Sequence, residues 1–221
     1  MLAKLAPMSG DNRVFLSNSG AEAVETAIKL ARTRTGRSKI IAFYGAFHGR
    51  TLGTLTLTAS KPVQRRSFGP LLPDILHTHY SYCYQCPVNR KPDSCEVQCL
   101  DLLTDSMFHH TVPPEEVAAV LVEPVQGEGG FIPPHPEFLR RLQVLCREHG
   151  ILLIADEVQT GAGRTGTWLA CEQWGVAPDL ITMAKSMAGG MPLSAIIGRA
   201  EVMDAPAVGG LGGTYAGNPV A

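Results

Sequence analysis

Three charged residues each directly follow a short apolar run that has the length of a β-strand. Glu123 follows VAAVLV, Asp156 follows ILLIA, and Lys185 follows DLITMA. The carboxyl ends of parallel strands meet at one edge of a sheet, where open α/β folds bind their ligands. Together with a glycine turn that opens a helix earlier in the chain, two carboxylates and a lysine at such an edge predict a site that holds an anionic ligand and uses lysine as a nucleophile.

Two of these residues also fit plainer roles. Lys185 lies between an apolar run and a Gly-Gly pair, which suits a desolvated nucleophilic amine but equally a lysine in a surface loop. Asp156 follows four aliphatic residues, so we expect it to be buried and to need a partner. That partner is a protonated ring nitrogen of a ligand, an arginine or a backbone amide.

A helix that could bind phosphate is expected over residues 21–34, because Val24, Ala27, Ile28 and Ala31 recur at helical spacing. It opens directly after Ser-Asn-Ser-Gly. Backbone N–H groups and the positive end of the helix dipole could therefore face a phosphate group. An ordinary helix cap is the alternative interpretation of the same residues.

The remaining elements indicate an α/β fold. Fully apolar strands that alternate with a helix are typical of a parallel sheet buried on both faces. Residues 51–58 suit either a strand or the start of a helix, and proline-rich residues 61–114 predict an irregular excursion with one helix near 97–107. The expected strands are 39–43, 117–124, 151–158, 179–184 and 194–198, with a helix over 137–149.

Composition narrows the class of partner. The 221 residues are 45% hydrophobic and 18% charged, as in a globular chain with one sizeable core, and the formal net charge is only −1. Such a balance argues against nucleic acid or an anionic membrane surface and favours a small molecule. We see no export signal and no apolar run long enough to span a bilayer, so we expect a cytoplasmic protein with reduced cysteines.

Six sequence motifs together resemble one enzyme family. In chain order they are SNSGAEAVETAIKLAR, AFHGRTLGTL, VEPVQGEGG, IADEVQTGAGRTG, AKSMAGGMPLSA and GGTYAGNP. They are similar to the class III (ω-amino acid) aminotransferases of the type I fold, which depend on pyridoxal phosphate. The resemblance implies an α/β large domain over residues 1–221 with a mostly parallel seven-stranded sheet flanked by helices. Because the chain stops inside GNPVA, we expect a fragment without the small C-terminal domain and with little turnover of its own.

The resemblance also implies roles for individual residues. Lys185 is expected to form the internal aldimine with pyridoxal phosphate and then to move a proton, and Asp156 to pair with the pyridinium nitrogen. The other implied cofactor-binding residues are Ser19, Gly20 and Ala21 at the phosphate, Phe47 stacked on the ring, His48, Val158 and Gln159 near the ring, and Thr214, which reaches the phosphate of the neighbouring subunit. This last role implies a homodimer with a shared active site.

Substrate recognition follows from the same resemblance. Arg50 is expected to bind a substrate carboxylate, and Glu123 and Glu128 to lie near the cofactor and substrate. The implied reaction moves an amino group from an ω-amino acid such as 4-aminobutyrate to a 2-oxo acid such as 2-oxoglutarate. Acetylornithine, ornithine or diaminobutyrate as donor, an aminomutase on the same scaffold, and a non-catalytic binding module remain as alternatives.

Four cysteines stand apart from these motifs. Cys83 and Cys86 are followed, after eight residues, by Cys95 and, after three more, by Cys99. Four thiolates can complete a tetrahedral zinc or iron–sulfur site. The spacing matches no standard zinc ribbon and transamination needs no metal, so we expect none and keep the metal site as the alternative.

Overall fold

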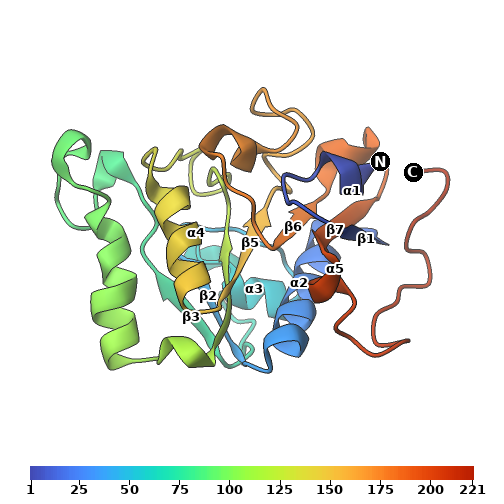
Figure 1. The fold of residues 1–221 in the computed structure, drawn as a ribbon, viewed down its shortest axis with the longest axis horizontal. Helices are drawn as coiled ribbons and strands as arrows, with labels where there is room; N and C mark the ends of the chain where they lie inside the picture. Colours follow the sequence, from blue (N-terminus) through green and yellow to red (C-terminus); the bar gives the residue numbers. More distant parts are fainter.

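A seven-stranded mixed sheet forms the centre of the computed structural model, which describes residues Met1–Ala221 (Figure 1). The strands lie in the order β1-β7-β6-β5-β4-β2-β3. Their bounds are β1 Asn12–Ser17, β2 Lys39–Phe43, β3 Ile75–Thr78, β4 Val117–Val122, β5 Leu152–Asp156, β6 Leu180–Met183 and β7 Ser194–Arg199.

Five neighbouring strands, β3, β2, β4, β5 and β6, pair in parallel. Strand β7 runs antiparallel to β6 and to β1. Every residue of β4 and β5 is buried, as expected for strands covered on both faces. The predicted mostly parallel α/β sheet is therefore confirmed.

Helices cover both faces of the sheet (Figure 1). Phe138, Leu139 and Leu142 of α4 pack into the core on one face, whereas Val24 and Ala27 of α2 pack into the core on the other. No helix has both the length and the apolarity needed to cross a membrane. The helices are α1 Leu2–Leu5, α2 Gly20–Thr35, α3 Leu52–Leu57, α4 Phe138–Glu148 and α5 Ala200–Met203.

Helix α2 begins and ends at residues whose chemistry sets its boundaries. The Ser19 side chain accepts a hydrogen bond from the Glu22 amide, and the Glu22 side chain accepts one from the Ser19 amide. This reciprocal capping box fixes the first turn. Gly36 ends the helix in the left-handed conformation that glycine adopts without steric cost. The helix predicted at 21–34 is thus confirmed, with one more residue at each end.

Two segments differ from the sequence prediction, and in a third the structure decides between two alternatives that the sequence left open. Residues 61–114 contain a strand, β3, which pairs at the sheet edge with β2 alone, and a π-helix, Leu102–Phe108, in place of the expected helix at 97–107. Strand β1 was not expected at all. Residues 52–57 form α3, whose first turn is held by the Glu25 carboxylate. Short 3₁₀ turns lie at Pro62–Gln64, Cys83–Gln85, Pro92–Ser94, Gln98–Leu100, Pro114–Glu116, Ala170–Trp174 and Lys185–Ala188.

Candidate active site

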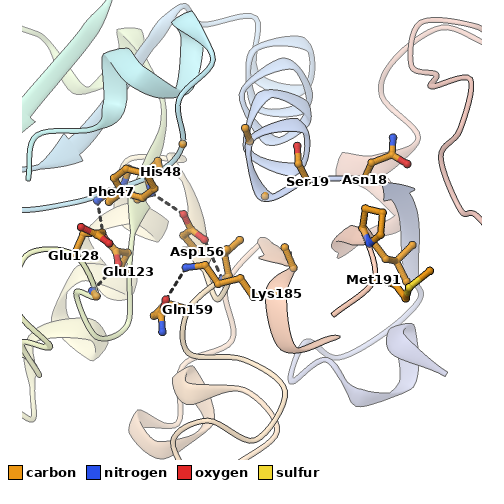
Figure 2. Close-up of a pocket in the computed structure, with 18 residues that line it drawn as sticks. Asn18, Ser19, Phe47, His48, Glu123, Glu128, Asp156, Gln159, Lys185 and Met191 are labelled. Carbon is orange, nitrogen blue, oxygen red and sulfur yellow. Dashed lines mark hydrogen bonds and ion pairs between the residues drawn. The ribbon is translucent and has the colours of Figure 1, made fainter. Parts of the chain in front are cut away.

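The carboxyl ends of β4, β5 and β6 open onto one cavity of about 300 Å³ (Figure 2). These strands are adjacent and parallel, so Glu123, Asp156 and Lys185 come to the same edge, as their positions in the sequence predicted. The cavity is lined by most of the predicted site residues: Ser19, Gly20, Ala21, Phe47, His48, Glu123, Glu128, Asp156, Val158, Gln159 and Lys185. Arg50 and Thr214 do not line it.

Asp156 ends β5 and is 3% exposed. Its Oδ1 accepts hydrogen bonds from the Thr182 hydroxyl at 3.0 Å and the Val158 amide at 3.1 Å. Its Oδ2 lies 2.7 Å from Nδ1 of His48, whose side chain is fully buried. The carboxylate is therefore fixed by three elements while one edge lines the cavity. His48, expected at the cofactor, contacts Asp156 and is placed to act through it.

Lys185 follows β6 in a conformation that is uncommon for a residue with a side chain. Its φ is +47°, in the left-handed region, which costs energy unless the surrounding structure enforces it. The amine donates to Oε1 of Gln159 at 2.5 Å (Figure 2). Of the two interpretations of this residue, the structure favours an exposed lysine over a desolvated one, and the exposed residue still lines the cavity.

The N-terminus of α2 points two amides at the cavity. The first helical residues, Gly20 and Ala21, cannot bond within the helix, and their amides form no other backbone hydrogen bond. A Cβ at Gly20 would lie 3.1 Å from Cγ1 of Val158, so the helix start approaches the strand ends this closely because glycine stands there. Two free amides at the positive end of a helix dipole suit a phosphate dianion.

Phe47 and Arg50 lie on the loop between β2 and α3. The Phe47 ring forms part of the cavity wall, and the Arg50 guanidinium sits 5.6 Å from the centroid of this ring. Arg50 is exposed and is not part of the cavity lining. It directly follows Gly49, which does line the cavity. A planar guanidinium beside the mouth of the cavity is suited to bidentate contact with a carboxylate.

The two glutamates have different surroundings. Glu123 is 4% exposed, and its two oxygens accept the amides of Phe47 and Gly127, each at 2.8 Å. Burial raises the pKa of Glu123 to about 6. Glu128 is half exposed and pairs with Lys61 at 3.0 Å, which lowers the pKa of its carboxyl. Glu123 therefore acts within the wall of the cavity and Glu128 at its rim.

Thr214 lies on the exposed C-terminal segment, in which residues 212–215 are all exposed. It lies outside the lining of the cavity in its own chain. This position leaves the hydroxyl accessible to another molecule, which is compatible with the expected role toward a neighbouring subunit. That role stays a prediction.

The four clustered cysteines line one small cavity with Ser81. All are free thiols, and no group of three or more His, Cys, Asp or Glu side chains is arranged to hold a metal ion. Burial raises the pKa of Cys83 and Cys99. The geometry therefore gives no support to the metal alternative.

Several functional contacts were not predicted. Thr182 bonds Asp156 from the neighbouring strand, and Lys61 pairs with Glu128 across 67 positions of sequence. The alternation of side chains along the adjacent β6 could have pointed to Thr182. Nothing local marks Lys61, and nothing local marks the short turn Met191 to Leu193 that completes the cavity.

The comparisons with known proteins agree on one class. The family model for class-III aminotransferases matches residues 1–221, and the chain belongs to this family. The 4-aminobutyrate aminotransferase GabT of Escherichia coli K12 is 53% identical over 209 residues, which are 95% of this chain and 47% of GabT. The 5-aminovalerate aminotransferase DavT of Pseudomonas putida KT2440 is 50% identical over 219 residues, 99% of this chain and 49% of DavT.

The fold agrees with solved transaminases. An amine transaminase from an uncultivated Pseudomonas species, in its PLP-bound form, matches with a TM-score of 0.87 and 34% identity over 94% of this chain and 50% of that one. The chain thus spans about half the length of the relatives that it matches. The family expected from the motifs is confirmed, with its fold.

The cavity fits pyridoxal phosphate, the cofactor of this family. A phosphate suits the two free amides of Gly20 and Ala21, and a protonated ring nitrogen suits the fixed carboxylate of Asp156. The exposed amine of Lys185 suits an aldehyde. All of these groups line the same cavity, so the donor set matches the three ends of the cofactor.

Proposed function

We propose that the protein carrying these residues is a pyridoxal phosphate-dependent aminotransferase that moves an amino group from an ω-amino acid, such as 4-aminobutyrate, to a 2-oxo acid such as 2-oxoglutarate. One observation carries the proposal: Lys185, Asp156 and the free amides at the start of α2 converge on a single cavity. The names of GabT and DavT support a terminal amine as donor.

Each residue then has a task. When bound, pyridoxal phosphate supplies a conjugated ring that takes up the electron pair left when the amine-bearing carbon loses a proton. The Asp156 carboxylate keeps a proton on the ring nitrogen, and the α2 amides hold the phosphate. Phe47 lines the cavity and would shield a face of the bound ring from water. The Nζ of Lys185 takes and returns the proton at the substrate carbon.

The far end of the substrate is a carboxylate, and two cations stand at the rim of the cavity. Arg50 offers a planar fork beside Phe47, and Lys61 offers a point charge beside Glu128. We assign the substrate carboxylate to Arg50, because Lys61 is already paired. Thr214 on the exposed C-terminal segment is assigned to the cavity of a second copy in a homodimer. The cytoplasmic location stays a prediction, which six free cysteines suit.

The test combines mass spectrometry with absorption spectroscopy. Purified protein is mixed with pyridoxal phosphate, reduced with borohydride and digested, and the cofactor mass is sought on the peptide that contains Lys185. We expect it there in the wild type and nowhere in Lys185→Ala. The absorption of the unreduced complex is then followed as 4-aminobutyrate, 5-aminovalerate, ornithine and acetylornithine are added in turn.

A change of spectrum with one amine, reversed by 2-oxoglutarate, identifies donor and acceptor together. Cofactor mass on another lysine, or none on any lysine, would overturn the assignment of the site. A spectrum that responds to an amine but never reverts with any 2-oxo acid would exclude amino transfer and favour another reaction on the same cofactor.

A further inference from the structure

Glu123 joins two loops that both contribute residues to the cavity wall. It follows β4, and its Oε1 accepts the Phe47 amide from the loop between β2 and α3, while its Oε2 accepts the Gly127 amide from the loop between β4 and α4. Both contacts are 2.8 Å long. Each oxygen of the carboxylate therefore already holds one amide of the cavity wall.

The backbone around Glu123 is itself fixed. The Tyr80 hydroxyl lies within hydrogen-bond distance of the carbonyl oxygens of Glu123 and Pro124, at 3.1 and 3.2 Å. The same two loops are joined a second time by the Gln126 side-chain amide, which donates to the Tyr44 carbonyl at 2.9 Å. The backbone that carries the Glu123 carboxylate is therefore held in place. Freedom to move is left to the Phe47 loop and the Gly127 turn.

We propose that Glu123 is a positioning residue for the cofactor site, which holds the Phe47 ring and the Gly127 turn at a fixed separation, and that gain of a proton by its carboxyl releases one of the two loops. A carboxylate accepts both amides, whereas a carboxylic acid keeps one of its oxygens as a donor. In the protonated group, a hydroxyl therefore takes the place of the oxygen that accepted one of the two amides. The inference rests on the proposed function, because it concerns the cofactor's place in the cavity.

The groups that face the Glu123 carboxyl bring its protonation close to neutral pH. Burial raises the pKa of Glu123, the His48 imidazole from the Phe47 loop lowers it, and the Asp156 carboxylate at the end of β5 raises it, giving about 6. Tyr80 faces it from the segment after β3. Ionised Glu123 holds both loops above this pH, and protonated Glu123 holds one below it.

The first test compares the affinity for pyridoxal phosphate of the wild type with that of Glu123→Gln between about pH 5 and pH 8. Glutamine keeps one acceptor but does not titrate. The ratio of the two affinities cancels the titration of the cofactor's own phosphate. At the higher pH we expect the wild type to bind the cofactor about ten times more tightly than Glu123→Gln, because the variant lacks one charge-assisted hydrogen bond. At the lower pH the two affinities are expected to become equal. A ratio independent of pH would overturn the proposal.

Glu157→Gln is the matched control. Glu157 is also buried, accepts a backbone amide, from Cys171, and has a pKa raised by burial, but it does not line the cavity. If the loss of any buried carboxylate had the same effect, the ratio of wild-type to variant affinity would be the same for both variants. The proposal predicts a ratio that changes with pH for Glu123→Gln alone.

Amide hydrogen exchange in the cofactor-free wild type provides a second test that needs no variant to fold. After correction for intrinsic rates, the protection of the Phe47 or the Gly127 amide is expected to fall as the pH drops below about 6. Unchanged protection of both would overturn the proposal. If the wild type bound no cofactor at any pH, the proposed function would fail, while this exchange experiment would still decide the role of Glu123.

Discussion

Asp156 is held by side chains that come from both directions along the sheet. Thr182 reaches it from the neighbouring strand β6, and His48 reaches it from the loop after β2, two strands away on the other side. With both oxygens bonded and 3% exposure, the carboxylate has little freedom to turn. A ring nitrogen placed beside it would therefore lie next to a charge whose position is fixed before any ligand binds. Such electrostatic preorganisation lowers the barrier of a reaction.

Replacing the imidazole tests this arrangement. In His48→Ala, Oδ2 of Asp156 loses its 2.7 Å partner inside a buried site, so we expect the free energy of unfolding to fall by about 3 kcal/mol. Urea denaturation of the cofactor-free protein measures it. His48→Gln keeps a donor of similar reach and is expected to recover part of the loss. A loss below about 1 kcal/mol for the alanine variant would mean that the pair is not holding Asp156.

At the scale of elements, α2 has two functions that share its first turn. Its capping box satisfies the amides of Ser19 and Glu22, while those of Gly20 and Ala21 remain for the cavity. The Glu22 carboxylate also accepts the Asn18 amide. Capping therefore stabilises the helix without consuming the donors assigned to the phosphate.

Ser19→Ala removes the side-chain half of the capping box. The Glu22 amide then lacks its acceptor, and we expect a loss of about 1 kcal/mol in the free energy of unfolding. Thermal unfolding followed by circular dichroism gives the value. Ser19→Thr is the control, because threonine retains the hydroxyl, and equal stability of the two variants would contradict the assigned cap.

Helix α3 is fastened to α2 through one carboxylate. Glu25 of α2 accepts the hydroxyl of Thr51 and the amide of Thr54, and a Cβ on Gly53 would lie within 2.4–2.7 Å of its carboxylate group. We expect Gly53→Ala to displace Glu25 and to lower the free energy of unfolding by about 2 kcal/mol.

A double-mutant cycle measures this coupling by urea denaturation. In a Glu25→Ala background the clash is gone, and Gly53→Ala is expected to become stabilising by up to about 1 kcal/mol, since alanine favours a helix more than glycine does. Equal effects of Gly53→Ala in the two backgrounds would show that Glu25 does not restrict position 53.

These elements also mark the limits of the sequence prediction. The strands β4, β5 and β6 could be predicted because their continuous apolar runs and the charged residues that end them are local signals. Strand β3 has four residues among prolines and exists through its pairing with β2, which no local pattern records. The exposure of Lys185 and the Lys61–Glu128 pair likewise depend on how distant loops meet, so the charges of the site could be predicted but not their surroundings.

At the scale of the whole molecule, one hydrophobic core holds several buried groups that are neutral when protonated. Burial raises the pKa of the Cys146 thiol in α4 and of the Cys171 thiol in the turn after the Asp156 loop well above the ordinary value for cysteine. Tyr80, also fully buried, has a pKa raised in the same way. The folded state therefore resists losing protons that the unfolded chain gives up at alkaline pH.

The sign of the effect on stability follows from linkage. Below about pH 8.5 both states keep the thiol protons, so the contribution is fully present. Above it the unfolded chain loses them and the folded protein does not, so each thiol lowers the free energy of unfolding by about 1.4 kcal/mol per pH unit. For Cys146 and Cys171 together, the wild type is expected to lose about 2.4 kcal/mol more stability than Cys146→Ala/Cys171→Ala between about pH 9 and pH 10.

Urea denaturation under reducing conditions at several alkaline pH values gives the two slopes, and Cys146→Ala alone serves as the internal control. It should remove about half of the difference, because the two thiols lie on different elements and titrate independently in the unfolded chain. Tyr80 adds the same slope to every variant near pH 10 and cancels from the comparison. Equal slopes for wild type and double variant would mean that these thiols ionise in the folded protein, so the two sulfur sites would have to admit water.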